Sequence, residues 1–184
     1  MANVIKRLHP SLFDKAVASI QDGLAENIAW LTNVFPIVER LAKVINGRTY
    51  YTPNVFVKGK EYELIAPDST LGNFCYFVLD EPQDVEWVVG DTSKLESPFS
   101  IVFWGDIRRI NDDRDTEAVK AEILRVLNGG FWMHEGSYTI NRIWQRAENV
   151  FRGFSLDEIE NQFMMQPYFA FRFEGTLKIK DECI

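Results

Sequence analysis

The chain has 184 residues, of which 46% are hydrophobic and 26% charged, and its formal net charge is −7. This length supports one well-formed core, and the composition is that of an ordinary globular domain. Tight, sequence-independent binding of DNA or RNA draws on a basic surface that neutralises phosphates. The acidic charge and the lack of any run of lysine and arginine argue against a protein of that class.

The two cysteines, Cys75 and Cys183, form no CxxC pair and are too few for a disulfide scaffold. Cys75 lies within the apolar stretch NFCYFVL, where a small buried hydrophobe is expected. The segment MANVIKRLHPSLFDK has no apolar core of a signal peptide, and no stretch approaches the roughly 20 apolar residues of a membrane span. We therefore expect a protein of a reducing, cytosolic compartment with no membrane association.

Residues 1–47 are predicted to form an amino-terminal helical region. Ser11 can cap a first helix, and Gly23 predicts a break within it. A further short helix is predicted over PIVERLAKVING, with Pro36 in its first turn and Gly47 at its end. The residues at helical spacing, with one polar exception, are Leu12, Ala16, Ile20, Leu24, Asn27, Ile28, Leu31, Ile37, Leu41, Val44 and Ile45.

Residues 48–184 are predicted to form an α+β sheet domain, in which a mixed or antiparallel sheet is packed by one or two helices, and the whole chain a single compact domain. A hairpin is predicted in NVFVKGKEYELIAP, with its turn at Lys58-Gly59-Lys60. NFCYFVLD and DVEWVVG follow as short strands, and residues 90–98 as a polar loop. FSIVFWGDI is apolar on both faces, which predicts a central strand covered on both sides.

The clearest predicted helix lies in NDDRDTEAVKAEILRVLNGG. Asp115 or Thr116 caps its start, and Asn128-Gly129 ends it. YTINRIWQ returns as a strand. Ser155 and Glu158 form a capping box that predicts another short helix.

The last strand has the most regular pattern in the sequence. From Tyr168 onward apolar and polar residues alternate strictly, which predicts a half-buried antiparallel strand. One face is predicted to hold Phe169, Phe171, Phe173, Gly175, Leu177 and Ile179, and the other Ala170, Arg172, Glu174, Thr176, Lys178 and Lys180. At ~3.3 Å per residue the strand spans about 40 Å. This length predicts a bulge or bend at Gly175, or an end that leaves the body.

Few residues suggest catalytic or metal chemistry. The histidines are His9 and His134, and the stretch HEGSY at the latter lacks the second histidine of a zinc-protease helix. Serine-hydrolase, P-loop and dinucleotide signatures are absent from the sequence. A solvated loop explains the acidic stretch 111–115, which does not match the calcium-loop pattern, although whether an ion binds there stays open. We therefore expect no enzymatic activity, no cofactor and no metal site.

Two segments are candidates for an oligomer interface. The predicted polar loop contains Asp91, Lys94 and Leu95, and the stretch FWMHE places Phe131 and Trp132 beside two glycines. Exposed aromatic side chains at a loop tip suit a partner surface. The same aromatic residues could instead cover the end of the core, and the polar loop could be a plain connection, so both alternatives stay open.

The order of the predicted elements resembles that of the tail terminator, or tail-completion, proteins of long-tailed bacteriophages. An amino-terminal helix leads into short strands and a hairpin, then a central strand, a capped helix and a long last strand. The stretches LGNFCYFVLDEPQ, FSIVFWGDIRRI and AENVFRGFSLDEIENQFMMQPYFAFRFEGTLKIKDEC resemble small proteins carried by prophages of gut Bacteroidetes. The likeness runs from Ser11 to Lys180 and rests on element order, without a diagnostic motif.

The resemblance implies a structural virion protein that assembles with itself into a ring, commonly of six subunits, caps the tail tube and joins it to the head. Its partners would be further copies of itself, the tail tube and neck or connector proteins, while DNA passes without specific binding. It would be found in the virion, and in the host cytoplasm during assembly. The long helical region up to Gly47 exceeds the family's single helix and leaves room for a head–tail connector role. A cytosolic small-molecule-binding domain is the alternative from another class.

Overall fold

The computed structural model describes residues 1–57, 62–88, 92–110, 113, 115–129, 136–155, 163 and 165–182. It has two sheets and few helices and consists mostly of strands, which is broadly the expected α+β class. In chain order the elements are β1 (Asn3–Val4), α1 (Phe13–Asn27), β2 (Asn33–Ile37), β3 (Glu39–Ile45), β4 (Arg48–Phe56), β5 (Tyr62–Leu64), β6 (Phe74–Leu79), β7 (Asp84–Val88), β8 (Thr92–Asp106), η1 (Ile107–Arg109), α2 (Thr116–Asn128), β9 (Gly136–Trp144), α3 (Ala147–Val150) and β10 (Tyr168–Glu182).

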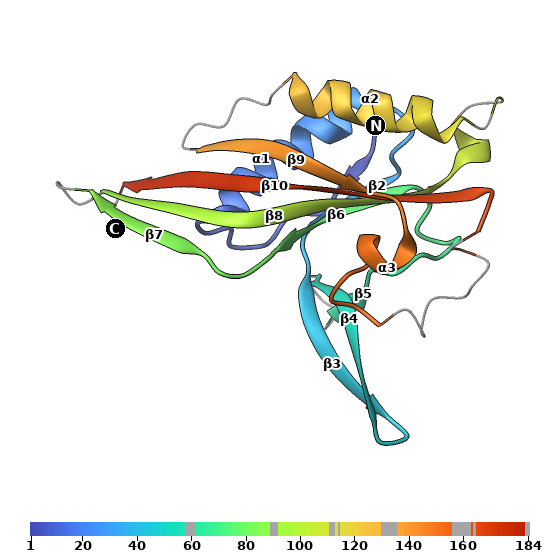
Figure 1. The fold of residues 1–184 in the computed structure, drawn as a ribbon, viewed down its shortest axis with the longest axis horizontal. Coiled ribbons are helices and arrows are strands. Elements are labelled where there is room, and N and C mark those ends of the chain that lie inside the picture. The colour runs from blue at the N-terminus through green and yellow to red at the C-terminus, as the bar shows by residue number, and fades with distance from the viewer. Residues whose placement is uncertain are drawn as a thin grey trace.

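A seven-stranded mixed sheet forms the body of the molecule (Figure 1). Its strand order is β1-β2-β6-β8-β10-β9, and β7 pairs with β8 beyond the end of β6. The β1–β2 and β2–β6 pairs are parallel, whereas β8 pairs antiparallel with both β6 and β10. The predicted central position of FSIVFWGDI is confirmed, because these residues form most of β8.

Helices α1 and α2 cover one face of this sheet (Figure 1). The alternation in β10 fills the core beneath them, since its phenylalanines at 169, 171 and 173 all lie in the helix-side cluster together with Leu177 and Ile179. Asp115 caps α2 as predicted, and its side chain accepts the N–H groups of Glu117 and Ala118 at 2.8 and 3.2 Å.

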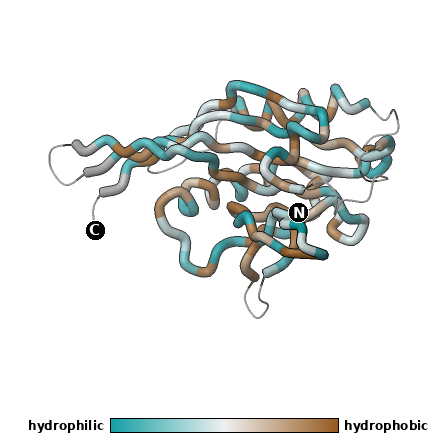
Figure 2. Tube along the Cα trace, turned by 60° about the horizontal axis from the view of Figure 1, so that its bottom comes forward, coloured by the Kyte–Doolittle hydropathy of each residue, from teal (hydrophilic) through white to brown (hydrophobic). Residues whose placement is uncertain are grey.

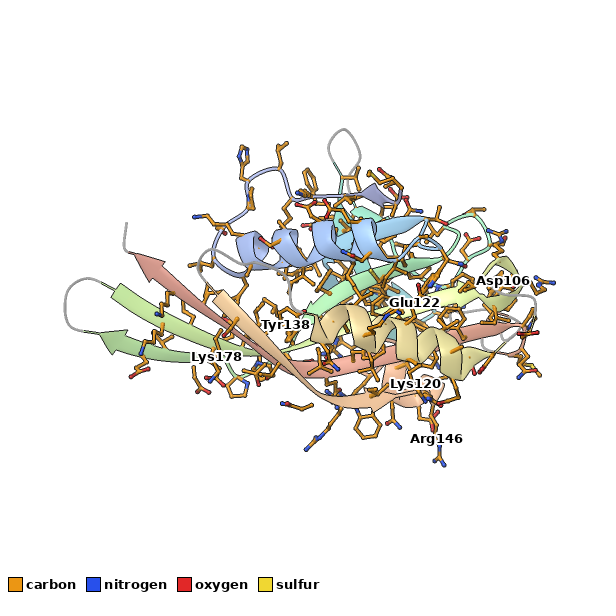
Figure 3. The ribbon with its side chains drawn as sticks, turned by 90° about the horizontal axis from the view of Figure 1, so that it is seen from above. Asp106, Lys120, Glu122, Tyr138, Arg146 and Lys178 are labelled. Atoms are coloured by element: carbon orange, nitrogen blue, oxygen red, sulfur yellow. The ribbon has the colours of Figure 1, made fainter. Side chains whose placement is uncertain are left out.

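Tyr138 ties β9 to the end of α2 (Figure 3). Its hydroxyl donates to the carbonyl of Leu127 at 2.6 Å, and burial raises the pKa of Tyr138 to about 12. The hydroxyl therefore stays protonated and donates this hydrogen bond at every physiological pH. The Leu127 carbonyl lies in the last turn of α2, where carbonyl groups lack an intrahelical partner, and the Tyr138 hydroxyl supplies one.

The opposite face of the sheet carries a second core, beneath a three-stranded sheet of order β3-β4-β5 and beside α3. Trp104 of β8 is its largest member, and it stacks between Phe74 at 5.5 Å and Tyr168 at 5.1 Å between ring centroids. Because Phe103 points into the helix-side core and Trp104 into this one, β8 is buried on both faces.

The predicted amino-terminal helical region is wrong beyond α1. The stretch PIVERLAKVING forms the end of β2 and all of β3, and β3 pairs antiparallel with β4 from Glu39–Asn54 to Ile45–Arg48. The connecting residues Asn46 and Gly47 have φ angles of 50° and 75°, which is the backbone of a two-residue hairpin turn and not a helix end. Residues 1–47 thus contribute strands to both sheets.

Helix α1 also differs from its prediction in detail. Its N-cap is Leu12 rather than Ser11, and it continues without a break through Gly23, which is buried against the sheet. The low helix propensity of glycine, about 1 kcal/mol relative to alanine, is therefore not enough to end the helix here.

The predicted polar loop at residues 90–98 is wrong from Thr92 onward, because these residues form the first half of β8. They pair with β10 on one side and β7 on the other, and the hydrogen bonds of two neighbours hold them extended. The strands predicted in NFCYFVLD, DVEWVVG and YTINRIWQ are confirmed as β6, β7 and β9. None of the helices in the described part of the chain has the length and apolarity needed to cross a membrane.

Two further predictions fall outside the described residues. They are the turn Lys58-Gly59-Lys60 of the hairpin, whose strands β4 and β5 are confirmed, and the helix expected after Ser155. The Ser155 hydroxyl accepts the backbone N–H of Tyr51 at 3.0 Å, so this serine binds the three-stranded sheet.

Candidate assembly surfaces

The first surface is a strand arm that extends beyond the two helices. We define the arm as β7, residues 92–98 of β8 and residues 176–182 of β10, which pair side by side and project from the body (Figure 1). Hydrophilic and hydrophobic residues alternate along it (Figure 2). Of the predicted interface residues, Lys94 and Leu95 lie here, on opposite faces of β8.

Charged side chains cover the arm face that points away from the helices. Two rows cross its strands, one from Asp84 through Glu96 to Lys178 and one from Glu86 through Lys94 to Lys180. Lys178, labelled in Figure 3, pairs with Glu96 at 2.6 Å, and Lys94 pairs with Glu86 at 3.6 Å. The acids of β7 form the outer edge and the lysines of β10 lie inward.

A groove of about 630 Å³ runs along the arm between residues of β7, β8, β9 and β10. Its lining includes the charged rows together with Val85, Leu95 and Ile179. Val85 is 50% exposed, whereas Ile179 is 5% exposed, so the apolar part of the arm opens to solvent toward its β7 edge.

The second surface is the β3–β4 hairpin, residues 40–51, which projects from the body on the side opposite the helices (Figure 1). Val44 is 69% exposed, and Ile45 and Tyr51 are also exposed. The Arg40 guanidinium lies 3.8 Å from the centroid of the Tyr51 ring, a cation–π contact that holds both side chains on one face. Apolar side chains displayed on a projecting element are typical of a contact surface.

The main sheet ends in strands with unpaired edges. Within the described residues, β7 pairs only with β8, and β9 pairs only with β10. An edge strand presents a row of N–H and C=O groups that can pair with another chain. The exposed polar and charged residues of β9, such as Asn141 and Arg142, are of the kind that limits unspecific pairing at such an edge.

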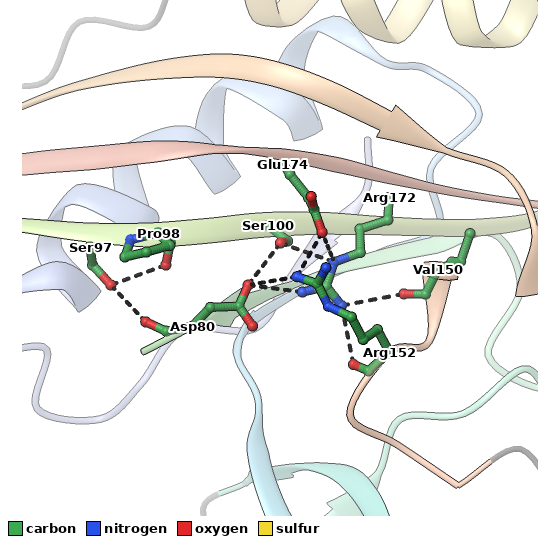
Figure 4. Close-up of polar contacts among 8 residues, drawn as sticks. All are labelled: Asp80, Ser97, Pro98, Ser100, Val150, Arg152, Arg172 and Glu174. Carbon is green, nitrogen blue, oxygen red and sulfur yellow. Dashed lines mark hydrogen bonds and ion pairs between the residues drawn. The ribbon is translucent and has the colours of Figure 1, made fainter. Parts of the chain in front are cut away.

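A buried polar cluster, which the sequence analysis missed, lies between the main sheet and α3 (Figure 4). At its centre is Arg172, fully buried although its strand face was expected to be the polar one. Its guanidinium donates to the Asp80 carboxylate at 2.9 Å and the Ser100 hydroxyl at 3.0 Å, and it lies 3.1 Å from a Glu174 oxygen. Arg152 approaches the same Glu174 oxygen at 2.9 Å.

This cluster holds the segment that supports the hairpin. Arg172 also donates to the carbonyls of Val150 and Arg152, at 3.5 and 3.3 Å, at the end of α3 (Figure 4). A few residues on, Ser155 and Tyr51 exchange two hydrogen bonds between this segment and β4. A chain of contacts thus runs from β10 through α3 to the hairpin, which fixes the direction in which the hairpin projects.

Three buried polar atoms near this cluster have no hydrogen-bond partner among the described residues, namely the Tyr76 hydroxyl, the Trp144 indole nitrogen and one Glu174 oxygen, which takes part in ion pairs. Burial raises the pKa of Tyr76 well above its usual value, so this hydroxyl is neutral. Burial likewise raises the pKa of the Cys75 thiol, which makes it an inert core residue, as expected.

The remaining predicted site residues divide into two groups. Asp91, Phe131 and Trp132 lie outside the described residues, as do His134 and most of the acidic stretch 111–115. His9 is exposed. Across the portion of the chain with defined placement, no group of three or more His, Cys, Asp or Glu side chains could hold a metal ion.

Neither a protein-family model nor a curated protein sequence matches the chain.

Proposed function

We propose that the chain is a structural protein of a bacteriophage virion, which assembles into a ring, terminates or completes the tail and joins it to the head. The tail tube, neck proteins and further copies of the chain are its partners, and DNA passes through the ring without specific binding. Its places are the virion and, during assembly, the host cytoplasm. The proposal rests on the resemblance of its element order and sequence stretches to tail terminator proteins.

One structural observation carries the proposal. Within the described residues the main sheet has unpaired edges at β7 and β9, and the arm of this sheet and the hairpin of the three-stranded sheet project in different directions. A subunit whose two contact surfaces differ makes head-to-tail contacts, and these generate a ring whenever the rotation between neighbours closes. The net charge of −7 supports the passage of DNA, because the 27 acidic residues outnumber the 20 Lys and Arg residues that could hold its phosphates.

The connector alternative has lost the feature that favoured it. The reason for considering it was a helical region longer than one helix, but β2 and β3 occupy the residues after α1. A small-molecule-binding domain is favoured by one observation, the arm groove of about 630 Å³, a volume within the range of ligand pockets. A metabolite that raises the unfolding temperature of the wild type, but not of a Leu95→Trp variant with a filled groove, would support it.

Capping of tail tubes tests the proposal. A phage tail-tube protein would be polymerised alone and with the purified chain, and the products viewed by electron microscopy. We expect ring-shaped density at one end of each tube and no further growth at that end. Tubes with two bare ends in the presence of excess chain would overturn the proposal. Rings that bind portal-side proteins and leave tubes bare would point to the connector.

A further inference from the structure

The two projections of the molecule carry opposite charges. Residues 40–51 of the hairpin contain Arg40, Lys43 and Arg48 and no acidic residue. Residues 80–86, which lead into β7, contain four acids and no basic residue: Asp80, Glu81, Asp84 and Glu86. The whole chain has a net charge of −7, so the hairpin is a basic element of an acidic protein, and the β7 edge has the opposite charge.

The acids at the edge differ in what they already contact. Asp80 is engaged by the buried Arg172, and Glu86 lies 3.6 Å from Lys94, an exposed pair of the kind that contributes little. Glu81, Asp84 and Glu86 are all exposed. The nearby Lys178 already forms an ion pair with Glu96 at 2.6 Å. The outer edge therefore remains acidic although lysines lie on the inner strands of the arm.

Apolar side chains are exposed beside the charges on both elements. Ile45 shares the hairpin face of Lys43 and Arg48, and Val85 is exposed on the β7 face opposite Asp84 and Glu86. Protein interfaces typically combine an apolar centre with a charged rim, and opposite charges across the contact set the partner and the register. The outer edge of β7, which has no strand partner among the described residues, adds main-chain groups that a neighbouring strand can pair with.

The hairpin and the β7 edge of one molecule cannot contact each other. The hairpin tip and β7 lie at the ends of separate projections that point away from the body in different directions (Figure 1). Any contact between them must therefore join two copies of the chain.

We propose that the β3–β4 hairpin of one copy docks on the acidic β7 edge of the next copy, with Lys43 and Arg48 facing Asp84 and Glu86. This inference rests on the proposed ring and names its contact surfaces. Because hairpin and edge are different surfaces, the contact is heterologous and repeats around the assembly. The Arg172 cluster, which fixes the direction of the hairpin, positions one surface relative to the other.

Charge reversal tests the contact. The hairpin variant carries Lys43→Glu and Arg48→Glu, and the edge variant Asp84→Lys and Glu86→Lys. The control, Glu26→Lys and Glu148→Lys, replaces two exposed acids elsewhere with the same change of net charge as the edge variant. Each is checked for folding by its thermal unfolding, and its mass is measured by light scattering over a range of concentrations.

We expect each of the first two variants to need at least about tenfold more protein to assemble, because like charges then meet across the contact. The control should assemble like the wild type. An equimolar mixture of the hairpin and edge variants should recover assembly, since each reversed surface then meets its complement.

Assembly that is unchanged by the reversals, or a mixture that fails to recover assembly, would overturn this docking while leaving the ring in place. A hairpin variant that assembles normally but no longer binds tail tubes would assign the hairpin to the tube instead. A wild type that never assembles would contradict the ring and the docking together.

Discussion

At the scale of single residues, Arg172 explains how the second face of the sheet is closed. A fully buried guanidinium costs several kcal/mol to desolvate, and carboxylates and carbonyls around it must compensate. Asp80, Glu174 and the carbonyls of Val150 and Arg152 do so here. The arginine therefore stabilises the fold only as part of the whole cluster.

Replacing Arg172 should accordingly be far more harmful than replacing its exposed neighbour. Arg172→Met removes the fully buried cation that pairs with Asp80 and Glu174 and is expected to lower the free energy of unfolding by about 3–5 kcal/mol. Arg152→Met removes an ion pair with the same Glu174, but this arginine is half exposed, so about 1 kcal/mol or less is expected. Urea denaturation of both variants measures the difference. Equal losses would show that burial of Arg172 is not the cause.

Asp106 provides a pH-dependent contribution to stability. The Arg108 side chain, which binds both carboxylate oxygens at 2.7 to 3.2 Å, holds the pKa of Asp106 below its ordinary value of 3.8. The lowered pKa means that this contribution is complete above pH 3.8 and is lost as the pH falls through the folded-state pKa.

We therefore expect Asp106→Asn to cost about 1 kcal/mol near neutral pH, because it removes the ion pair with Arg108 while the asparagine can still cap η1. The difference in the free energy of unfolding between wild type and variant should disappear as the pH falls below 3.8. Chemical denaturation at several pH values measures it, and a gap that stays constant into acid would contradict the assigned role of the charge.

At the scale of elements, the long last strand depends on a bulge. The register between β10 and β9 shifts between Glu174 and Gly175, as the length of the strand predicted. A Cβ at position 175 would lie 1.6 Å from the carbonyl oxygen of Thr139, so only glycine fits. The extra residue of the bulge is Asn141 of β9, so β9 is the strand that bends at this point, beside the close approach of Gly175.

Gly175→Ala should thus be more destabilising than Gly47→Ala, although both replace a glycine in the same way. At position 47 no atom lies within 4 Å of the new Cβ, and the cost is the strain of a positive φ, about 1 kcal/mol. At position 175 the backbone itself must move, and we expect a loss of at least about 2 kcal/mol. Thermal unfolding compares the two. The reverse order would place the strain at the hairpin turn and not at the bulge.

The elements also show what the sequence could and could not predict. The alternation of phenylalanines was sufficient to predict β10, and Asp115 was sufficient to predict the start of α2, because each is a local sequence pattern. The turn Asn46-Gly47 is a strong hairpin signal, but Ile37, Leu41 and Val44 also fit helical spacing, and that reading was wrong.

Two further misses arose from tertiary pairing. Thr92 to Pro98 carry few apolar residues, so the sequence resembles a polar loop, and only the pairing with β10 and β7 reveals a strand. Arg172 belongs to the polar parity of β10, and nothing in the sequence shows that a second core closes over it.

At the scale of the whole molecule, a rigid body with two unlike projections is suited to repeat contacts. The helix side is closed by α1 and α2, whereas the arm, the hairpin and the β9 edge remain open to partners in the described structure. The proposed ring uses these surfaces, and its central requirement is that the chain associates with itself.

The mass of the purified chain in solution tests this requirement most directly, measured by light scattering across a wide concentration range and repeated with tail tubes present. The account predicts a closed oligomer, such as a hexamer, or growth toward one as the concentration rises or when tubes are added. A monomer at every concentration that also leaves the tubes unbound would contradict it.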